Sequence, residues 1–381
     1  MALRLLPDAP SPPVVLEARM SAPPAGTPAT LPEKSSLPPV DTDGLVHLYR
    51  EMLLIRRLEE LAAKAYTQRK ILGFCHLYIG QESVAVGTAA AAGDDYWLSA
   101  YREHGHAMAK GVPPREVMAE LFMKETGSSK GQGGSMHIFD KRVRFMGGYG
   151  IVGGHVPLAN GVAWAIKHRQ EQRVCVCFFG DGAANQGAFF EALCLAQLYK
   201  LPVVFICENN GYAMGTAIER QSALTEMSLR GRGVGMVHET VLGFDVEVVR
   251  DRVAAAREFA VAGNGPVLLE FITYRYRGHS MSDPAKYRPK GELEDVKKTR
   301  DPIDMITARL SEDHGVPQER LDALKAEVEE ICQEAVTFAE ESPLPDDATL
   351  YDYVYAPQTT TLGVGPDAPT HTLEQSKAEA G

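Results

Sequence analysis

The sequence predicts an α/β fold with a mostly parallel sheet flanked by helices, and three observations lead to this expectation. Short apolar runs of strand length alternate with segments of helical period. Two of the runs end in polar, glycine-containing turns, which is where open parallel sheets bind ligands. The 381 residues are 45% hydrophobic and 23% charged, which is ordinary for a globular chain long enough to bury a sizeable core.

The elements can be placed in order along the chain. Residues 45–68 carry apolar side chains at three- and four-residue spacing, which predicts an amphipathic helix. Buried strands are expected at 173–179, 202–207 and 267–273, with a helix over 184–199 between the first two. Residues 318–340 predict a late, charge-rich helix that packs on the surface with one solvated face.

The two ends of the chain differ from this folded block. Residues 1–40 hold ten of the 24 prolines, a composition that predicts a flexible arm rather than a packed structure. Prolines interrupt the short apolar start, and acidic residues with few arginines argue against a mitochondrial leader. We therefore expect a flexible arm (1–40), one folded domain (41–355) and a flexible tail (356–381).

Composition excludes several classes of protein. The formal net charge of -11 argues against a non-specific nucleic-acid binder, and no apolar run is long enough to span a membrane. Six cysteines are too few for a disulfide scaffold, so six buried, reduced thiols are expected. A reducing compartment follows, with a bacterial cytoplasm as the expected location and the mitochondrial matrix as the alternative.

The most informative stretch begins where the first strand ends, at Gly180-Asp181-Gly182. Glycines on both sides of the aspartate allow a tight turn and a close approach of the backbone to a ligand. The helix that follows offers unpaired backbone N–H groups, which suit a phosphate. Asp181 is a hard oxygen ligand at a point where phosphate oxygens could share a magnesium ion.

The next strand ends in Glu208-Asn209-Asn210-Gly211-Tyr212, and Asn210 lies 29 residues after Asp181. One strand–helix–strand unit fits this interval, so both strand ends emerge at the same edge of a parallel sheet. Asp181 and Asn210 should therefore approach each other and present side-chain oxygens to one cation. Either half of this pattern alone would suit an ordinary turn, whereas both together predict a site.

A second glycine motif competes with this interpretation. Residues 148–153 match the dinucleotide fingerprint, a helical segment follows over 156–167, and Glu171 lies near the distance expected of a ribose-binding acid. The fingerprint should follow a clear strand, but residues 142–146 form a poor one. A nicotinamide enzyme would bind NAD without magnesium, so calorimetry separates the two hypotheses.

The paired motif resembles that of thiamine diphosphate enzymes, in which Gly-Asp-Gly is followed about 30 residues later by Asn-Asn. The resemblance implies a thiamine diphosphate-binding fold. It also implies that Mg²⁺ is bound by Asp181, Asn210 and the carbonyl of Tyr212. The backbone amides of Gly182 and Ala183 would contact diphosphate oxygens.

Further strings extend the resemblance from about residue 45 to 340. The chain is similar to the alpha subunit of the decarboxylating component of 2-oxo acid dehydrogenase complexes in residues 73–82, 101–105, 133–137, 150–153 and 276–284. Residues 208–216 and 279–284 resemble the pyruvate dehydrogenase (acetyl-transferring) branch of that family. Tyr149 and His155 depart from the common pattern, and His155 could alter packing near the cofactor.

The resemblance implies roles for further residues. Tyr101 would contact the aminopyrimidine ring, to which Gly150 and Val152 would offer backbone groups, and Arg102 would pair with the diphosphate. His76 and His279 would be catalytic residues that line the active-site channel. They would interact with the substrate carboxylate or assist acyl transfer. Ser280 matches a phosphorylated serine of mitochondrial relatives, and we expect it to be unmodified here.

The resemblance also implies partners and a reaction. Pyruvate would be decarboxylated and the two-carbon unit passed to the lipoyl group of an acyltransferase component. The glutamate that activates the cofactor would come from a beta subunit, because no second thiamine-type domain fits in the folded block. An inactive lone chain and an α2β2 heterotetramer are therefore expected. The alternatives are a branched-chain or acetoin dehydrogenase subunit, or a scaffold that has lost its chemistry.

Overall fold

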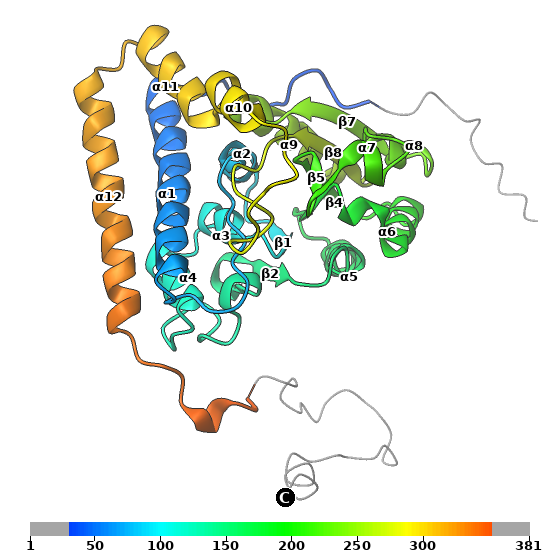
Figure 1. Ribbon diagram of the computed structural model, residues 1–381. Helices are drawn as coiled ribbons and strands as arrows, with labels where there is room; N and C mark the ends of the chain where they lie inside the picture. Colours follow the sequence, from blue (N-terminus) through cyan, green and yellow to red (C-terminus); the bar gives the residue numbers. More distant parts are fainter. Residues whose placement is uncertain (1–29, 353–381) are drawn as a thin grey trace, which may run out of the picture. The chain divides into compact units, whose positions relative to one another are not determined.

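The computed structural model describes residues 30–352, and its first compact unit, which ends at Leu344, is built on a parallel sheet (Figure 1). The strands are β1 (Tyr96–Ala100), β2 (Phe145–Tyr149), β3 (Cys175–Gly180), β4 (Val203–Asn209), β7 (Val237–Leu242) and β8 (Val267–Ile272). They are arranged in the order β2-β1-β3-β4-β8-β7, and every neighbouring pair is parallel. A short antiparallel hairpin consists of β5 (Tyr212–Ala213) and β6 (Thr216–Ala217). The predicted α/β fold with a mostly parallel sheet is confirmed.

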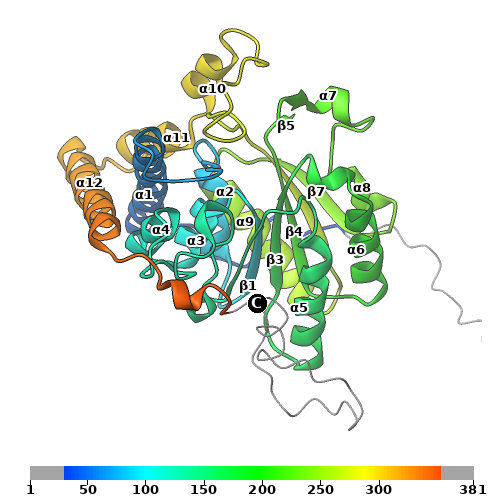
Figure 2. The same ribbon diagram turned by 60° about the horizontal axis from the view of Figure 1, so that its bottom comes forward.

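Helices cover both faces of the sheet, as Figure 2 shows. One face carries α1 (Thr42–Thr67), α2 (Glu82–Ala91), α3 (His104–Lys110), α4 (Pro114–Leu121), α9 (Val246–Val261), α11 (Pro302–Glu312) and α12 (Gln318–Glu341). The other carries α5 (Val156–His168), α6 (Gly187–Leu198) and α8 (Leu229–Arg232). The short α7 (Ile218–Gln221) and α10 (Glu292–Arg300) lie beyond the sheet, and 3-10 turns occupy Gly134–Met136, Lys141–Val143 and Ala183–Asn185.

Alternation along the central strands creates these two layers. In β3, Val176 and Phe178 enter the core beneath α2 and α9, whereas Cys175, Cys177 and Phe179 enter the core beneath α5 and α6. Successive side chains of a strand point to opposite faces, so an unbroken apolar run becomes a strand buried on both sides. The placement of Cys175 and Cys177 on one strand face agrees with their spacing in the sequence.

The predicted helices occur with small shifts of their ends. The expected helix over 184–199 begins as the 3-10 turn Ala183–Asn185, and its α-helical part starts only at Gly187. The late helix is α12, which packs on α1 and α4. Half-exposed glutamates of α12 form ion pairs with arginines of α1, Arg50–Glu327 and Arg57–Glu329. The interpretation as a surface packing helix is confirmed.

Residues 30–40, assigned to the arm by composition, lie against α9. Ser35 Oγ donates to Asp251 Oδ1 at 2.6 Å, and Arg252 donates to the carbonyl of Pro32 at 2.8 Å. These contacts correct the expected boundary of the arm at residue 40. Hydroxyl and carbonyl groups of residues 30–40 form hydrogen bonds with Asp251 and Arg252 of α9, so this segment is held on the folded domain. The remainder of the arm and the tail from residue 356 lie outside the described residues. The second unit begins at Pro345, and its described part holds the 3-10 turn Asp347–Thr349.

Two expectations from composition can be compared with the structure. Within residues 30–352, no helix combines the length and apolar character that a membrane crossing requires. All six thiols are free and five are buried, but Cys194 is exposed. The expectation that all six would be buried was wrong, because Cys194 lies on the outward side of α6, a periodicity that an apolar run conceals.

Candidate functional site

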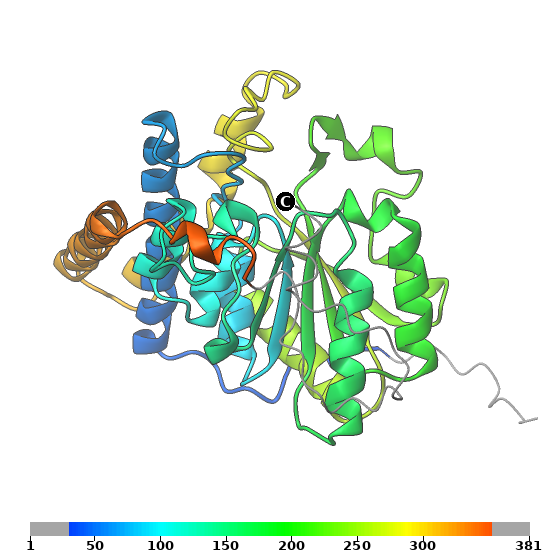
Figure 3. The same ribbon diagram turned by 90° about the horizontal axis from the view of Figure 1, so that it is seen from below.

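The carboxyl ends of three strands meet at one edge of the sheet and bring predicted residues together. Tyr101 and Arg102 follow β1, Asp181 follows β3, and Asn210 follows β4. The strand order reverses between β1 and β3, because the chain leaves β1 outward to β2 and returns on the other side to β3. Ligands of open α/β sheets bind outside such a reversal point. In Figure 3 the segment before α10 and the segment with β5 and α7 both stand above this edge.

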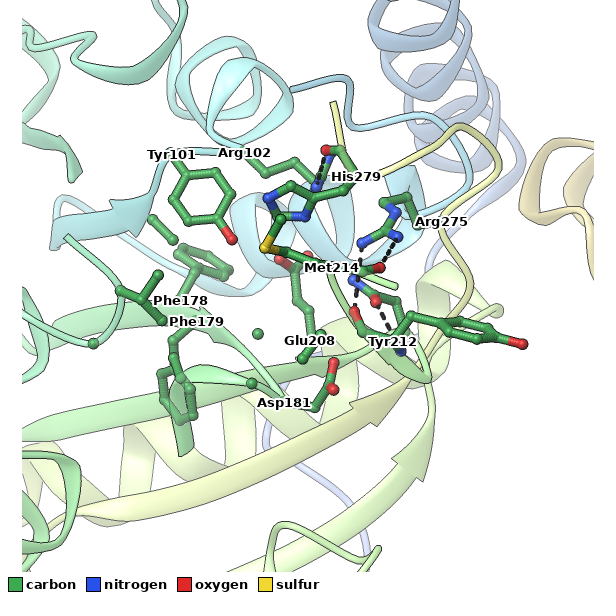
Figure 4. A pocket seen from close by; sticks show the side chains of 18 of the residues that line it. Tyr101, Arg102, Phe178, Phe179, Asp181, Glu208, Tyr212, Met214, Arg275 and His279 are labelled. Carbon is green, nitrogen blue, oxygen red and sulfur yellow. Dashed lines mark hydrogen bonds between the residues drawn. The ribbon is translucent and has the colours of Figure 1, made fainter. Parts of the chain in front are cut away.

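A cavity of about 250 Å³, here called the inner cavity, lies at this reversal point (Figure 4). Its lining includes nine of the residues predicted from sequence: Tyr101, Arg102, Val152, Asp181, Gly182, Ala183, Asn210, Tyr212 and His279. An adjoining cavity of about 650 Å³, the outer cavity, includes the other two, His76 and Gly150. Tyr101, Val152, Met214 and His279 line both, so they stand where the two cavities meet.

Three oxygen-bearing groups at the strand ends could hold a cation: the Asp181 carboxylate, the Asn210 side-chain amide and the backbone carbonyl of Tyr212. Asp181 is 1% exposed, and its Oδ2 accepts a hydrogen bond from the Gln221 amide. Asn210 donates its amide N–H to Gln81 Oε1 at 3.0 Å, and its own Oδ1 accepts from the Tyr212 backbone N–H at 3.4 Å. Carboxylate, amide and carbonyl oxygens are the ligands that Mg²⁺ and Ca²⁺ prefer.

The composition of this set matters because residues 30–352 contain no group of three or more His, Cys, Asp or Glu arranged for a metal ion. A cation at the sheet edge would therefore depend on one carboxylate, one amide and one backbone carbonyl. Burial raises the pKa of Asp181, and the Gln221 amide counteracts part of that effect. A buried carboxylate in this situation gains from a nearby positive charge.

Arg275 is a site residue that the sequence reasoning missed. It follows β8, is 2% exposed, and lines the inner cavity. Its guanidinium donates to the carbonyls of Tyr212 at 3.4 Å and Met214 at 3.0 Å, as Figure 4 shows. Burial lowers its pKa, and Asp181 acts in the opposite direction. Its place directly after a strand, among three arginines in residues 274–289, was the available signal.

Arg102 has partners that the sequence did not predict. Its two terminal nitrogens donate to the carbonyls of Leu77 and His279, each at 2.7 Å. Burial, followed by the charge of Arg275, lowers its pKa to about 10. A guanidinium has five N–H donors, so these two bonds leave others for an anion in the inner cavity. Contact with a diphosphate therefore stays a prediction.

The two predicted catalytic histidines sit in the outer cavity with uncharged rings. Burial and the charge of Arg102 lower the pKa of His76 to about 2 and that of His279 to about 4. The Nδ1 atoms of both rings are buried without a hydrogen-bond partner in the described part of the chain. Two neutral imidazoles with open ring nitrogens can exchange protons with a bound ligand.

Other buried polar groups around the inner cavity were also missed. Gln81 is 1% exposed, and its Nε2 has no partner among residues 30–352. Glu208 accepts from Tyr78 Oη and lies 3.3 Å from His106 Nε2. Gln81 falls inside a string that the resemblance used, and Glu208 directly precedes the Asn-Asn pair, so both could have been proposed from position alone.

The competing dinucleotide fingerprint has a better context than the sequence indicated. A strand, β2 (Phe145–Tyr149), does lead into residues 148–153, and α5 follows. Residues 142–144 form no strand, in line with the expectation, and β2 begins only at Phe145 and overlaps the fingerprint. Glu171, however, lies beyond the far end of α5, where it pairs with Arg173 at 3.0 Å. A ribose held at the start of α5 would be about 20 Å away.

The fold and the cavity together define a class of protein: an α/β protein with a cavity at the reversal point of its parallel sheet, where proteins of this architecture bind ligands. The model of the dehydrogenase E1 component family matches residues 50–347, so the chain belongs to that family.

Curated proteins show the same relationship over most of their length. The chain is 49% identical over 323 residues to the pyruvate dehydrogenase E1 component subunit alpha of Zymomonas mobilis, covering 83% of this chain and 91% of that one. It is 48% identical over 304 residues to the protein of the same description from Rhizobium meliloti, covering 80% and 87%. Its identity is 44% over 324 residues to the mitochondrial pyruvate dehydrogenase E1 component subunit alpha of Dictyostelium discoideum, covering 84% and 85%.

Proposed function

We propose that this chain is the alpha subunit of a thiamine diphosphate-dependent pyruvate dehydrogenase component, which decarboxylates pyruvate and reductively acetylates the lipoyl group of an acyltransferase. The observation that carries the proposal is the meeting of Asp181, Asn210, Tyr101, Arg102 and His279 around one cavity. These residues were assigned to the cofactor from separate strings of the sequence. The relatives named above are pyruvate dehydrogenase subunits, which supports pyruvate over the branched-chain acid and acetoin.

The residues around the inner cavity fit thiamine diphosphate, on which this family depends. Two guanidinium groups, Arg102 and Arg275, face it beside the amides of Gly182 and Ala183, which suits a diphosphate. Asp181, Asn210 and the carbonyl of Tyr212 would hold the Mg²⁺. The unpartnered Nε2 of Gln81 gives the bound group a further donor.

In the proposed reaction the bound cofactor would supply the carbanion and the electron sink that decarboxylation needs. The chain's own residues would bind, orient and exclude water. His76 and His279, uncharged in the outer cavity, would hold the substrate carboxylate or move a proton at their Nδ1 atoms. Arg102 would fix the backbone of both segments through Leu77 and His279.

We further infer that a beta subunit completes the site in an α2β2 heterotetramer. The carboxylates that line the inner cavity are Asp181 and Glu208. Asp181 is assigned to the cation, and Glu208 is engaged by Tyr78 and His106. The glutamate that activates the cofactor would therefore come from the partner, which also builds part of the acyl pocket. The proposed location is a bacterial cytoplasm, while one of the three relatives named above is mitochondrial by name.

The direct test measures turnover with an artificial electron acceptor after co-purification with the beta partner. Pyruvate, 2-oxoisovalerate and acetoin would be compared with and without thiamine diphosphate and Mg²⁺. Cofactor-dependent turnover that prefers pyruvate is expected, and the isolated chain should be inactive. Preference for another substrate would reassign the physiological role, and absence of turnover with all three would favour a scaffold.

The cation site has its own test in the variant Asp181→Asn. Loss of the carboxylate should abolish Mg²⁺-dependent binding of thiamine diphosphate in calorimetry, because the amide oxygen lacks the charge of a hard ligand. Asp322→Asn, an exposed change on α12, serves as the matched control and should bind as the unaltered assembly does. Undiminished Mg²⁺-dependent binding by Asp181→Asn would remove Asp181 from the cation site.

A further inference from the structure

A buried row of three side chains lies behind the outer cavity. Glu59 on α1 and His104 on α3 are 3.0 Å apart, measured from Oε1 to Nδ1. The other ring nitrogen of His104, Nε2, lies 2.9 Å from the Oγ of Ser135 in the glycine-rich 3-10 turn. Glu59 and His104 are 1% exposed and Ser135 is 4% exposed. Such a buried polar row is costly unless its members satisfy one another or something beyond them.

What lies beyond the row is the backbone of residues 75–79, which carries His76. This segment has no regular secondary structure although all five residues are buried. Its buried N–H groups therefore need partners outside the hydrogen-bond ladder of a helix or sheet. The His76 N–H donates to Ser135 Oγ at 3.3 Å, and the Tyr78 N–H donates to Glu59 Oε1 at 3.2 Å. The row therefore holds the segment at two backbone N–H groups, those of His76 and Tyr78.

The hydrogen-bond roles along the row are mutually consistent. If His104 Nδ1–H donates to Glu59, Nε2 accepts from the Ser135 hydroxyl, whose oxygen then accepts the His76 N–H. A doubly protonated ring would instead donate from Nε2 to the Ser135 carbonyl, 3.0 Å away. In both cases Ser135 Oγ keeps a lone pair for His76.

Serine, histidine and carboxylate in this order also occur in hydrolytic triads. That alternative requires an accessible hydroxyl. Ser135 lines neither the inner nor the outer cavity, and its oxygen already accepts the His76 N–H. An acyl substrate could not reach it, so the geometry favours positioning over nucleophilic attack.

Positioning matters here because the ring of His76 is held by packing against other rings and not by a hydrogen bond at Nδ1 to any described residue. Its Nδ1 has no partner in residues 30–352, and the ring packs against Tyr101 with centroids 4.6 Å apart. The place of its backbone therefore decides where the imidazole lies in the outer cavity. Misplacement of a catalytic group by about 1 Å can cost much of its effect.

We propose that Ser135, oriented by His104 and Glu59, is a positioning residue that sets the place of the His76 imidazole. The inference rests on the proposed function, since it assumes that His76 acts in turnover. If Ser135 acts through His76, its removal should matter only while that imidazole is present.

A double-mutant cycle on the co-purified assembly tests this. Ser135→Ala should lower kcat for pyruvate about tenfold, the consequence of one lost hydrogen bond and a displaced ring. In the His76→Ala background the same change should lower kcat less than about twofold. Ser128→Ala is the matched control, because the buried Oγ of Ser128 has no partner in the described part of the chain.

Each outcome decides something. An equal loss in both backgrounds would overturn the proposal, as would a loss of the same size in Ser128→Ala. If Ser135→Ala fails to assemble, the cycle is repeated with Ser135→Cys, which has nearly the same shape and a weaker acceptor. Failure of the unaltered assembly to turn over any 2-oxo acid would count against the proposed function, whereas turnover with equal losses would count against the role of Ser135 alone.

Discussion

The imidazole rings of His76 and His279 lie edge to face in the outer cavity, with 5.1 Å between their centroids and 78° between their planes. Arg102 links the two segments by donating to the carbonyls of Leu77 and His279. The Met281 N–H adds a third link by donating to the Cys75 carbonyl at 2.9 Å. The two histidines therefore form one constrained pair rather than two separate groups.

The pair predicts non-additive effects on turnover. His76→Ala and His279→Ala should each lower kcat for pyruvate about 100-fold, which is within the usual contribution of a positioned acid or base. The double variant should lose little more than either single variant, since groups that act as a unit do not add. His168→Ala, which alters an exposed histidine at the end of α5, should leave kcat unchanged. Multiplied losses in the double variant would show that the histidines act separately.

The carboxylate of Glu120 should stabilise the glycine-rich turn of residues 129–134. One carboxylate oxygen accepts the backbone N–H groups of Ser129 and Gly131, and the other accepts those of Gly133 and Gly134, all within 2.8–3.0 Å. Glu120→Gln turns an amide group toward two of these donors. We expect a loss of about 2–3 kcal/mol in the free energy of unfolding.

Urea denaturation of the assembly measures that loss, and hydrogen exchange should quicken at the four amides first. Glu116→Gln, on the same helix, removes only an ion pair with the exposed Arg142 and should cost less than about 0.5 kcal/mol. Equal losses in the two variants would mean that the turn does not depend on the Glu120 carboxylate.

The sequence indicated the centre of the site because that centre depends on local patterns. A Gly-Asp-Gly turn after an apolar strand and Asn210 one strand–helix–strand unit later fix both positions on the sheet edge without knowledge of packing. Arg275, Gln81 and Glu208 stood beside strands or motifs that the sequence did reveal, but only the folded chain shows that all three line the cavity.

The same limit explains the errors at the edges of the fold. Strand β2 reads as a loop because Gly147 and Gly148 weaken its strand pattern, yet pairing with β1 stabilises it. Residues 30–40 have the composition of a flexible arm, but Asp251 and Arg252 on α9 supply their polar partners. Composition gives average tendencies, whereas these segments are ordered by particular contacts.

The space beside Gly148 is filled by the Glu103 carboxylate, so this position should tolerate no larger residue. A Cβ at this position would lie 0.7 Å from Glu103 Oε2, and Glu103 is 0% exposed. The carboxyl cannot move into solvent, and burial raises its pKa well above the usual value. Gly148→Ala should therefore lower the free energy of unfolding by more than about 3 kcal/mol or prevent folding.

Gly161 provides the matched control, since it is an exposed helical glycine of α5 with open space around its Cβ position. Gly161→Ala should stabilise the protein by about 0.5–1 kcal/mol, because alanine favours the helix. Thermal melting of both variants makes the comparison. A Gly148→Ala variant that melts with the unaltered protein would show that Glu103 has room to move.

His155 predicts how stability depends on pH. Burial lowers its pKa to about 4, although a hydrogen bond from Nε2 to the Phe178 carbonyl at 2.7 Å favours the charged ring. In the unfolded chain the ring takes up a proton near pH 6.5. Between pH 6.5 and 4 the unfolded state therefore binds more protons, and the free energy of unfolding falls by about 1.4 kcal/mol per pH unit as pH decreases.

His155→Gln keeps an N–H donor for the Phe178 carbonyl and removes the titration. Its melting temperature at pH 8 should stay close to that of the unaltered protein, and its loss of stability toward pH 4 should be smaller. The slope will be reduced rather than abolished, because the lowered pKa values of His76 and His279 act in the same direction. Melting curves at intervals from pH 8 to 4 measure both quantities. An unchanged slope with an unchanged melting temperature at pH 8 would mean that His155 is already able to take up a proton in the folded protein.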